Sequence, residues 1–463
     1  MRALTGILIF SLVTSTLLGF YQWQNHQNMS AQSDEEMIEE QVTIDEQSNY
    51  LTIEHTFNEL NEINYEAKIP QSITNISCVN NEGCEIEEDE TLVVENLNEL
   101  TITYEAPIEP LISGVKYNQD WLIKLQPVQI ADVKKEKTVS FLANKEGKWV
   151  SSMKPVTSNE RESIHYYEWR LYGEQNLPLY KFYENLKLVT EIKDTGIYST
   201  ESEELTDQEK NDFFKYEELV HNRLIVISDQ LESITLSEMV IVDDVGRVNS
   251  ELLKSHLKSI TKNYSDDYNW VVNELAKYFF IGEGGQIVEE LKQQLTEEQQ
   301  DHLFNSLVEQ KRPVDETLLN YIDQLLSDIL GYEVDFIKQN YESNIFVPLS
   351  GIDSRIVYLD EQQVDLSVRL KSEGLYVSVE HVIDLVELNG FNVNGRSEWF
   401  IQFENDRYRF YVNRDVYTVN DRRYSVQPDT WFQYGNDLYV DYSLIEDLFD
   451  FTFSFSDDEI MIR

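Results

Sequence analysis

The spacing of apolar residues changes twice along this chain, and this change limits the folds that are open to it. From residue 49 to about 155 apolar and polar residues alternate. Residues 160–345 carry apolar stripes at helical spacing, and alternation returns after 365. A period of two indicates strands with one wet face, whereas a period of 3.6 indicates helices. The chain is therefore predicted to be an α+β protein with several domains.

We predict five segments along the 463 residues, a length that corresponds to roughly two to four folded domains. Residues 1–22 form a signal anchor or transmembrane helix, and 23–48 form an acidic linker. Residues 49–158 form an antiparallel, β-sandwich-like domain. Residues 159–350 form a mainly helical α/β domain, which the resemblance described below makes a candidate for a degenerate metallopeptidase fold. Residues 365–463 form a C-terminal α+β domain with an internal repeat.

The chain carries 37 Lys+Arg residues against 85 Asp+Glu residues, a formal net charge of −48. This charge would repel a phosphate backbone, so nucleic acid is excluded as a partner. An excess of acid reports on solubility and surroundings and not on fold. It suits a salty or alkaline habitat, or a surface that faces an anionic envelope.

Residues 5–21 (TGILIFSLVTSTLLGFY) form an uncharged, mostly apolar run of about 17 residues. Arg2 precedes the run, which places the N-terminus in the cytoplasm and the bulk of the chain outside. We predict an uncleaved signal anchor, so the membrane is a partner and the protein is a single-pass cell-membrane protein. A cleaved signal, which would make the protein secreted, and a buried core helix are the alternatives.

The chain has two cysteines, Cys78 and Cys84, with turn-forming residues 80–83 between them. Two short apolar arms around such a turn predict a β-hairpin in which the cysteines face each other. An extracytoplasmic location would permit a disulfide, and two free thiols are the alternative. Two thiolates without a nearby His do not complete a tetrahedral zinc shell, so no metal site is predicted there.

The middle region combines two buried strands, predicted at 224–227 and 239–242, with several amphipathic helices. Thr296 and Gln299 have the spacing of a helix capping box. A further apolar stripe that begins at Leu318 is stopped by Gly331. We interpret these stripes as core.

The C-terminal region repeats one pattern. Residues 375–393 and 438–456 each predict a strand, an amphipathic helix and a returning strand, and a hairpin is predicted over 399–412. This layout resembles the copper amine oxidase N-terminal-like domain, or stalk domain, over residues 365–463, about a fifth of the chain. The positions that match the family's strand and turn motifs are Tyr376–Val379, Val393, Val419–Asp421 and Leu438–Val440.

The chain departs from that family at Ser378 and Asp441, where the family prefers Pro, and at Asp421, where it prefers Gly. The buried apolar positions are kept, so the resemblance still implies the family's fold. It implies no copper chemistry, because His381 stands alone without a second His at ligand spacing. We predict no cofactor.

The segment 270–280 (WVVNELAKYFF) resembles the zinc-binding helix of gluzincin metallopeptidases, whose pattern is His-Glu-x-x-His. Asn273 and Lys277 occupy the two His positions and only Glu274 is kept, so Glu274 is the one catalytic candidate. The family's third ligand would fall on Thr296 or Glu297. The resemblance therefore implies a site without zinc. An ordinary amphipathic helix is the alternative interpretation.

Arginine and tyrosine are enriched in the C-terminal domain of this acidic chain. Arg407, Arg409 and Tyr411 share one face of a predicted strand, and Arg414 follows. Arginine beside exposed aromatic rings suits a carbohydrate or an anionic polymer, so these four residues are candidate binding residues. Ion pairing within the domain is the alternative.

These features predict a membrane-anchored, extracytoplasmic envelope protein without catalytic activity, which binds or scaffolds through its stalk-like domain. A cell-wall polymer or another envelope protein would be its partner. The competing hypothesis is a zinc metallopeptidase-like enzyme with an unusual set of ligands.

Overall fold

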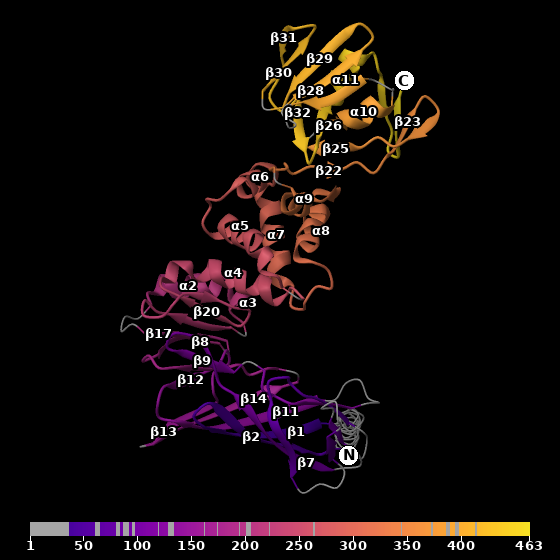
Figure 1. Cartoon of the computed structure of the whole chain (residues 1–463). Coiled ribbons are helices and arrows are strands. Elements are labelled where there is room, and N and C mark those ends of the chain that lie inside the picture. The colour runs from indigo at the N-terminus through magenta and orange to yellow at the C-terminus, as the bar shows by residue number, and fades with distance from the viewer. Residues whose placement is uncertain are drawn as a thin grey trace, which may run out of the picture. The chain divides into compact units, whose positions relative to one another are not determined.

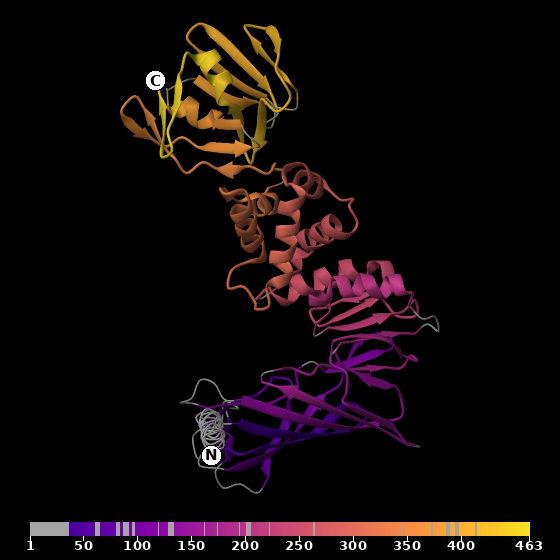
Figure 2. The same ribbon diagram turned by 180° about the vertical axis from the view of Figure 1, so that it is seen from behind.

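A computed structural model of the chain is shown in Figures 1 and 2. It describes residues 37–463 except 61–64, 80–83, 87–91, 95–97, 119, 128–133, 162, 174, 194, 201–204, 222, 263, 344, 372–373, 386–388, 394–397 and 413. The protein is a mixed α+β molecule with several sheets. It divides into two compact units. Unit 1 runs to Leu205 and includes Asn222–Glu232, and unit 2 comprises Thr206–His221 and Ser233–Arg463.

Unit 1 is built on a seven-stranded sheet in which β1 and β11 are parallel and the other neighbours are antiparallel. In spatial order its strands are β13 (Thr157–Glu160), β14 (Ile164–Tyr172), β11 (Lys134–Asn144), β1 (Met37–Glu46), β2 (Tyr50–Asn58), β7 (Glu99–Pro107) and β4 (Thr74–Val79). Burial alternates along β2, where Leu51, Ile53, His55 and Phe57 point inward. The predicted period of two is confirmed here.

Smaller sheets complete unit 1. One contains β10 (Lys124–Pro127), β3 (Tyr65–Lys68), β6 (Leu92–Val94) and β5 (Cys84–Ile86). Another contains β12 (Lys148–Val150), β15 (Leu179–Phe182), β9 (Val115–Asn118) and β8 (Glu109–Ile112). Strand β17 (Thr195–Ser199) pairs with β16 (Lys187–Ile192) antiparallel and with β18 (Leu224–Ile227) parallel.

The predicted acidic linker, residues 23–48, is wrong in its second half. Met37–Glu46 form strand β1 near the middle of the large sheet, with Ile38, Val42 and Ile44 buried. Of the acidic residues in this strand that suggested a linker, Glu39 is exposed on the other face, and Glu40 is buried among charged partners. Charge clusters indicate a solvated segment only when no apolar alternation runs beneath them.

The predicted anchor, residues 5–21, lies outside the described residues. Within 37–463, apart from the gaps given above, no helix is long and apolar enough to cross a membrane. Cys78 lies on β4 and is disulfide-bonded. The side chain of Cys84 is outside the described part, so its pairing with Cys78 stays a prediction.

The first part of unit 2 is mainly helical. Helix α4 packs on β20 (Figures 1 and 2). The elements are α2 (Asp207–Lys215), α3 (Glu217–Val220), β19 (Ile234–Thr235), β20 (Met239–Val242), α4 (Val248–Ser259), α5 (Asn269–Phe280), α6 (Gln286–Gln294), α7 (Glu297–Glu309), α8 (Leu318–Leu330), β21 (Glu333–Val334) and α9 (Phe336–Glu342). Thr296 and Gln299 form the predicted capping box, and Gly331 ends α8 in the left-handed conformation with φ 78°.

The second part of unit 2 contains the predicted repeat. Strand β26 (Gly374–Ser378), α10 (Val379–Leu385) and β27 (Asn389–Val393) form one copy; β33 (Asp437–Asp441), α11 (Tyr442–Phe449) and β34 (Phe453–Phe455) form the other. Strands β26 and β33 pair antiparallel. They belong to a sheet with β21, β22 (Gly351–Ile352), β25 (Val368–Lys371) and β32 (Trp431–Tyr434).

Two further sheets each include the returning strand of one copy of the repeat. One is formed by β24 (Gln362–Val364), β23 (Ile356–Leu359), β35 (Glu459–Ile462) and β34, and the other by β27, β28 (Glu398–Phe403), β29 (Asp406–Tyr411), β30 (Val416–Val419) and β31 (Arg422–Ser425). The predicted hairpin over 399–412 is confirmed as β28 and β29.

Candidate functional site

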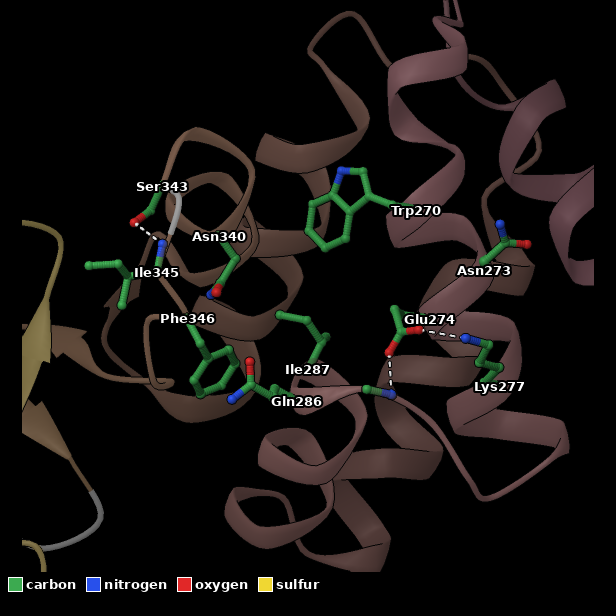
Figure 3. Close-up of a pocket in the computed structure, with 11 residues that line it drawn as sticks. Trp270, Asn273, Glu274, Lys277, Gln286, Ile287, Asn340, Ser343, Ile345 and Phe346 are labelled. Carbon is green, nitrogen blue, oxygen red and sulfur yellow. Dashed lines mark hydrogen bonds and ion pairs between the residues drawn. The ribbon is translucent and has the colours of Figure 1, made fainter. Parts of the chain in front are cut away.

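Helix α5 presents a partly exposed stripe to a pocket of about 490 Å³. Trp270, Asn273, Glu274 and Lys277 lie at i, i+3, i+4 and i+7, which places them on one helix face. The opposite face is buried core. Figure 3 shows Trp270 and Glu274 extending from α5 on one side, with Asn340, Ile345 and Phe346 on the other. Gln286 and Ile287 from the start of α6 complete the lining.

The carboxylate of Glu274 is held by two partners. Lys277 Nζ donates to Oε1 at 2.8 Å, and the backbone N–H of Gly285 donates to Oε2 at 2.8 Å. Gly285 is the N-cap of α6, and an anion at a helix N-terminus is stabilised by the unpaired N–H groups there. Glu274 is largely buried, with 15% of its side chain exposed. Both of its oxygens are therefore engaged within the protein.

Gly285 has a steric reason to be glycine. A Cβ atom at this position would lie 2.9 Å from Glu274 Oε2, closer than real Cβ contacts. The absence of a side chain lets the backbone N–H reach the carboxylate. The sequence GEGG at 282–285, which looks like a plain turn, thus helps to build the site.

The other wall of the pocket is fixed by Asn340. Its Nδ2 donates to the carbonyl oxygens of Phe336 and Val347, at 2.9 and 2.8 Å, and its Oδ1 accepts from the N–H of Val347 at 3.0 Å. These bonds hold the chain after α9 against that helix. Trp270 stacks on Tyr341 of α9 with ring centroids 6.5 Å apart and an interplanar angle of 11°. The aromatic wall is thereby tied to the same helix.

The residues of this pocket do not fit a zinc ion. Zinc in proteins is held by His, Cys, Asp or Glu, and the two positions that resemble His ligands carry Asn273 and Lys277. The ammonium of Lys277 already occupies the Glu274 carboxylate and would repel a metal. Thr296 and Glu297, the positions of the third ligand, are exposed at the start of α7 and do not line the pocket. No group of potential metal ligands occurs among the described residues.

The predicted arginine face is present on β29. Tyr408 and Phe410 are buried while Arg407, Arg409 and Tyr411 face outward. Arg409 is paired with Glu398, and Arg407 lies 3.5 Å from Asp421. The guanidinium groups of Arg409 and Arg414 lie 5.5 and 5.9 Å from the ring centre of Tyr411. Arg407 and Arg409 therefore have carboxylate partners within their own domain.

Sequence reasoning singled out Glu274 and its neighbours and missed the rest of the pocket. The spacing of Trp270 relative to Glu274 is a signal that could have been read. Gly285, Asn340 and Phe346 carry no such signal, because they reach the pocket from α6, α9 and the chain after α9.

Comparison with known proteins gives a weak resemblance to gluzincin metallopeptidases of the M1 family. No family model and no curated protein matches the chain. Among solved structures, an M1 zinc metallopeptidase from Deinococcus radiodurans matches with 10% identity and a TM-score of 0.39, covering 67% of this chain and 92% of that one. A mutant of it bound to a Tyr-Ser-Ala substrate matches with 10% identity and a TM-score of 0.43, covering 66% and 93%.

An aminopeptidase N family protein from Idiomarina loihiensis matches with 11% identity and a TM-score of 0.32, covering 52% of this chain and 53% of that one. A likeness at this level concerns the fold, and activity has to be argued from the residues.

These comparisons bear on two predictions. The prediction of an envelope protein without catalytic activity that binds through a stalk-like domain is contradicted: the solved structures reported above are M1 zinc metallopeptidases and an aminopeptidase N family protein. No family model matches residues 365–463, so nothing in these comparisons supports the stalk-domain description. The predicted transmembrane segment, residues 5–21, lies outside the described residues and stays a prediction.

The stalk resemblance followed local strand–turn–helix alternation, which unrelated folds share. At its departures the structure uses ordinary local devices. Asp441 caps α11 through the N–H of Ser443, and Asn420 and Asp421 turn the chain with positive φ.

Proposed function

We propose that this chain is a metallopeptidase-like protein that binds a peptide segment in the pocket beside α5, without a zinc ion. The observation that carries the proposal is the composition of the pocket. The pocket is lined by the apolar side chains of Trp270, Ile287 and Phe346 and by the side-chain amides of Asn273 and Gln286. Figure 3 shows Gln286 beside Phe346 and Ile287.

Amide side chains both donate and accept hydrogen bonds, which is the pairing that a peptide backbone requires. Within the described residues, no hydrogen bond engages the side chains of Asn273 and Gln286, so both remain available to a ligand. An apolar wall with a few polar groups is typical of sites for small organic ligands and peptides. The hydrogen bond between Lys277 and Glu274 holds these two lining side chains in place.

A direct test is binding of a short-peptide library to the full chain, followed by calorimetry on the best binder. We expect Trp270→Ala to weaken binding about tenfold or more, because aromatic anchors carry much of the energy in such sites. Ile281→Ala is the matched control, since Ile281 follows α5, is 59% exposed and does not line the pocket.

Zinc content and peptide cleavage are measured on the same samples. We expect binding to persist in a chelator and zinc to stay well below one ion per chain. Failure of every peptide to bind would refute the peptide pocket. Stoichiometric zinc, with cleavage that Glu274→Gln abolishes, would refute the absence of zinc and leave the peptide pocket standing.

A further inference from the structure

Unit 1 contains a second pocket, of about 370 Å³, which the proposed function does not use. It lies where the turn after β11, the start of β12, strands β13 and β14, and the chain after β15 meet. Its size falls within the range of about 300–1,000 Å³ that is usual for small-molecule sites.

The floor of this pocket is a hydrogen-bonded pair, His165 and Tyr167. The Tyr167 hydroxyl accepts from the backbone N–H of Trp149 at 3.4 Å and lies 3.3 Å from His165 Nδ1. Burial raises the pKa of Tyr167 to about 12, so the hydroxyl keeps its proton and can donate it to Nδ1. With the hydroxyl donating to Nδ1, the neutral imidazole carries its hydrogen on Nε2, and the doubly protonated ring carries one there as well. His165 Nε2 is enclosed and makes no hydrogen bond within the described part of the chain.

The second donor is the ammonium of Lys148. It donates to the carbonyl oxygen of Leu186 at 3.0 Å and lies 5.6 Å from the ring centre of Tyr198. No carboxylate of the described residues lies within ion-pair distance of it. An ammonium has three N–H donors, and one carbonyl leaves two of them for a ligand.

The exposed carboxylate of Glu160 already lies at the position that an anion would take. Its Oε1 is 3.3 Å from His165 Nε2, without hydrogen-bond geometry, and 3.9 Å from Lys145 Nζ. Glu160 is 66% exposed, so it can move aside at little cost. Glu184 also lines the pocket and bears the same charge.

We propose that this pocket binds a small organic carboxylate, with His165 Nε2 and Lys148 Nζ as its donors and Glu160 as the internal group that the ligand displaces. The net charge of −48 does not prevent this, because charges further than the Debye length of about 8 Å at physiological salt are largely screened.

The test is calorimetry of the full chain with succinate, with 1,4-butanediol as the uncharged analogue of the same length. We expect succinate to bind and butanediol not to bind. Lys148→Met should weaken succinate binding about tenfold or more, the change expected when a charged hydrogen-bond partner is lost. Lys154→Met is the matched control, because Lys154 pairs with Glu191 and does not line the pocket.

Glu160→Gln provides a test with the opposite sign. It removes the competing carboxylate from an exposed position, so the fold should be kept and succinate should bind more tightly. Three results would overturn the proposal. The first is no binding of succinate at about 10 mM, a concentration above the dissociation constants of about 1 mM that mark weak binding. The others are butanediol binding as tightly as succinate, and Glu160→Gln binding succinate more weakly than the parent chain. Inorganic phosphate that binds as tightly as succinate would overturn the choice of a carboxylate.

Discussion

At the scale of single residues, the α5 pocket depends on how one carboxylate is satisfied. Glu274 accepts from an ammonium on its own helix and from a backbone N–H on the next. A hydrogen bond to a charged group contributes about 1.5–3 kcal/mol, more than a neutral one. The pair Glu274–Gly285 therefore joins α5 to the start of α6, and it depends on a glycine that has no special backbone angle but has no room for a side chain.

We predict that Gly285→Ala lowers the free energy of unfolding by about 1–3 kcal/mol, because the added Cβ displaces the carboxylate from its N–H donor. Denaturant unfolding measures the change. In a Glu274→Ala background the same substitution should cost little, since the clash is gone. Gly246→Ala is the control, because a Cβ there would meet its neighbours at 3.5 Å or more. Equal losses in both backgrounds would contradict this account.

At the scale of elements, strand register brings a charged cluster into the core of unit 1. Glu40 on β1 stands opposite Lys137 on β11, and His55 lies on β2. His55 Nε2 and Lys137 Nζ each lie 3.0 Å from Glu40 Oε2, and Tyr104 Oη of β7 lies 3.4 Å from His55 Nδ1. All four side chains are buried. Removing one member would leave a buried charge or donor without its partner, which is costly.

This cluster predicts a loss of stability in mild acid. Burial lowers the pKa of His55 below its ordinary 6.5, although Glu40 opposes the shift. The unfolded chain then takes up the proton more readily than the folded one, so stability is kept above about pH 6.5 and lost as pH falls below it. Burial raises the pKa of Glu40, but hydrogen bonds and charge attraction from His55 and Lys137 outweigh it and lower that pKa below its ordinary 4.5. The protein should therefore lose further stability as the pH falls below about 4.5.

Thermal unfolding between pH 8 and pH 5, a span of about three units around the ordinary pKa of His, measures this effect. We expect His55→Gln to be less stable at pH 8 and to lose less stability on acidification than the parent chain. His302→Gln is the control, since His302 is exposed on α7. An unchanged acid profile in His55→Gln would contradict the assignment.

At the scale of the whole molecule, the net charge of −48 is the dominant electrostatic property. Like charges repel more in the folded chain than in the expanded one, which lowers the stability of the compact state. Ion pairs such as Lys154–Glu191 and Arg247–Asp243 are exposed and contribute little against this repulsion. The stability that offsets this repulsion must therefore come from the buried apolar cores of the two units.

We predict that salt stabilises the protein. Raising NaCl from about 0.01 M to about 0.15 M shortens the Debye length from about 30 Å to about 8 Å, which screens the repulsion. The melting temperature at neutral pH should rise over this range and then level off. KCl should act equally, as expected for screening and not for binding of a particular cation. A melting temperature that is flat or falls with salt would contradict the prediction.

Much of the local structure can be predicted from residues that are close together in the chain. The period-two alternation of β2, the capping box at Thr296, the stop at Gly331 and the strand–helix–strand repeat all depend on residues near one another in the chain. These patterns reflect local backbone geometry and the exposure of alternate residues to solvent, so they can be recognised in a single sequence. The segment 37–46 was missed because its charges concealed the alternation.

The contacts between distant parts of the chain depend on how the elements pack. Only folding brings Gly285 to Glu274, Asn340 and Phe346 to the face of α5, and Lys148 to His165. These pairs come from different elements, and no local rule encodes a meeting that depends on how helices and strands pack. The replacement of both His positions by Asn273 and Lys277 was visible in the sequence, and so was the i,i+3 spacing that lets the Lys277 ammonium reach the Glu274 carboxylate on the same helix. The second partner of that carboxylate, the N–H of Gly285, required the folded chain, because it comes from the start of the next helix.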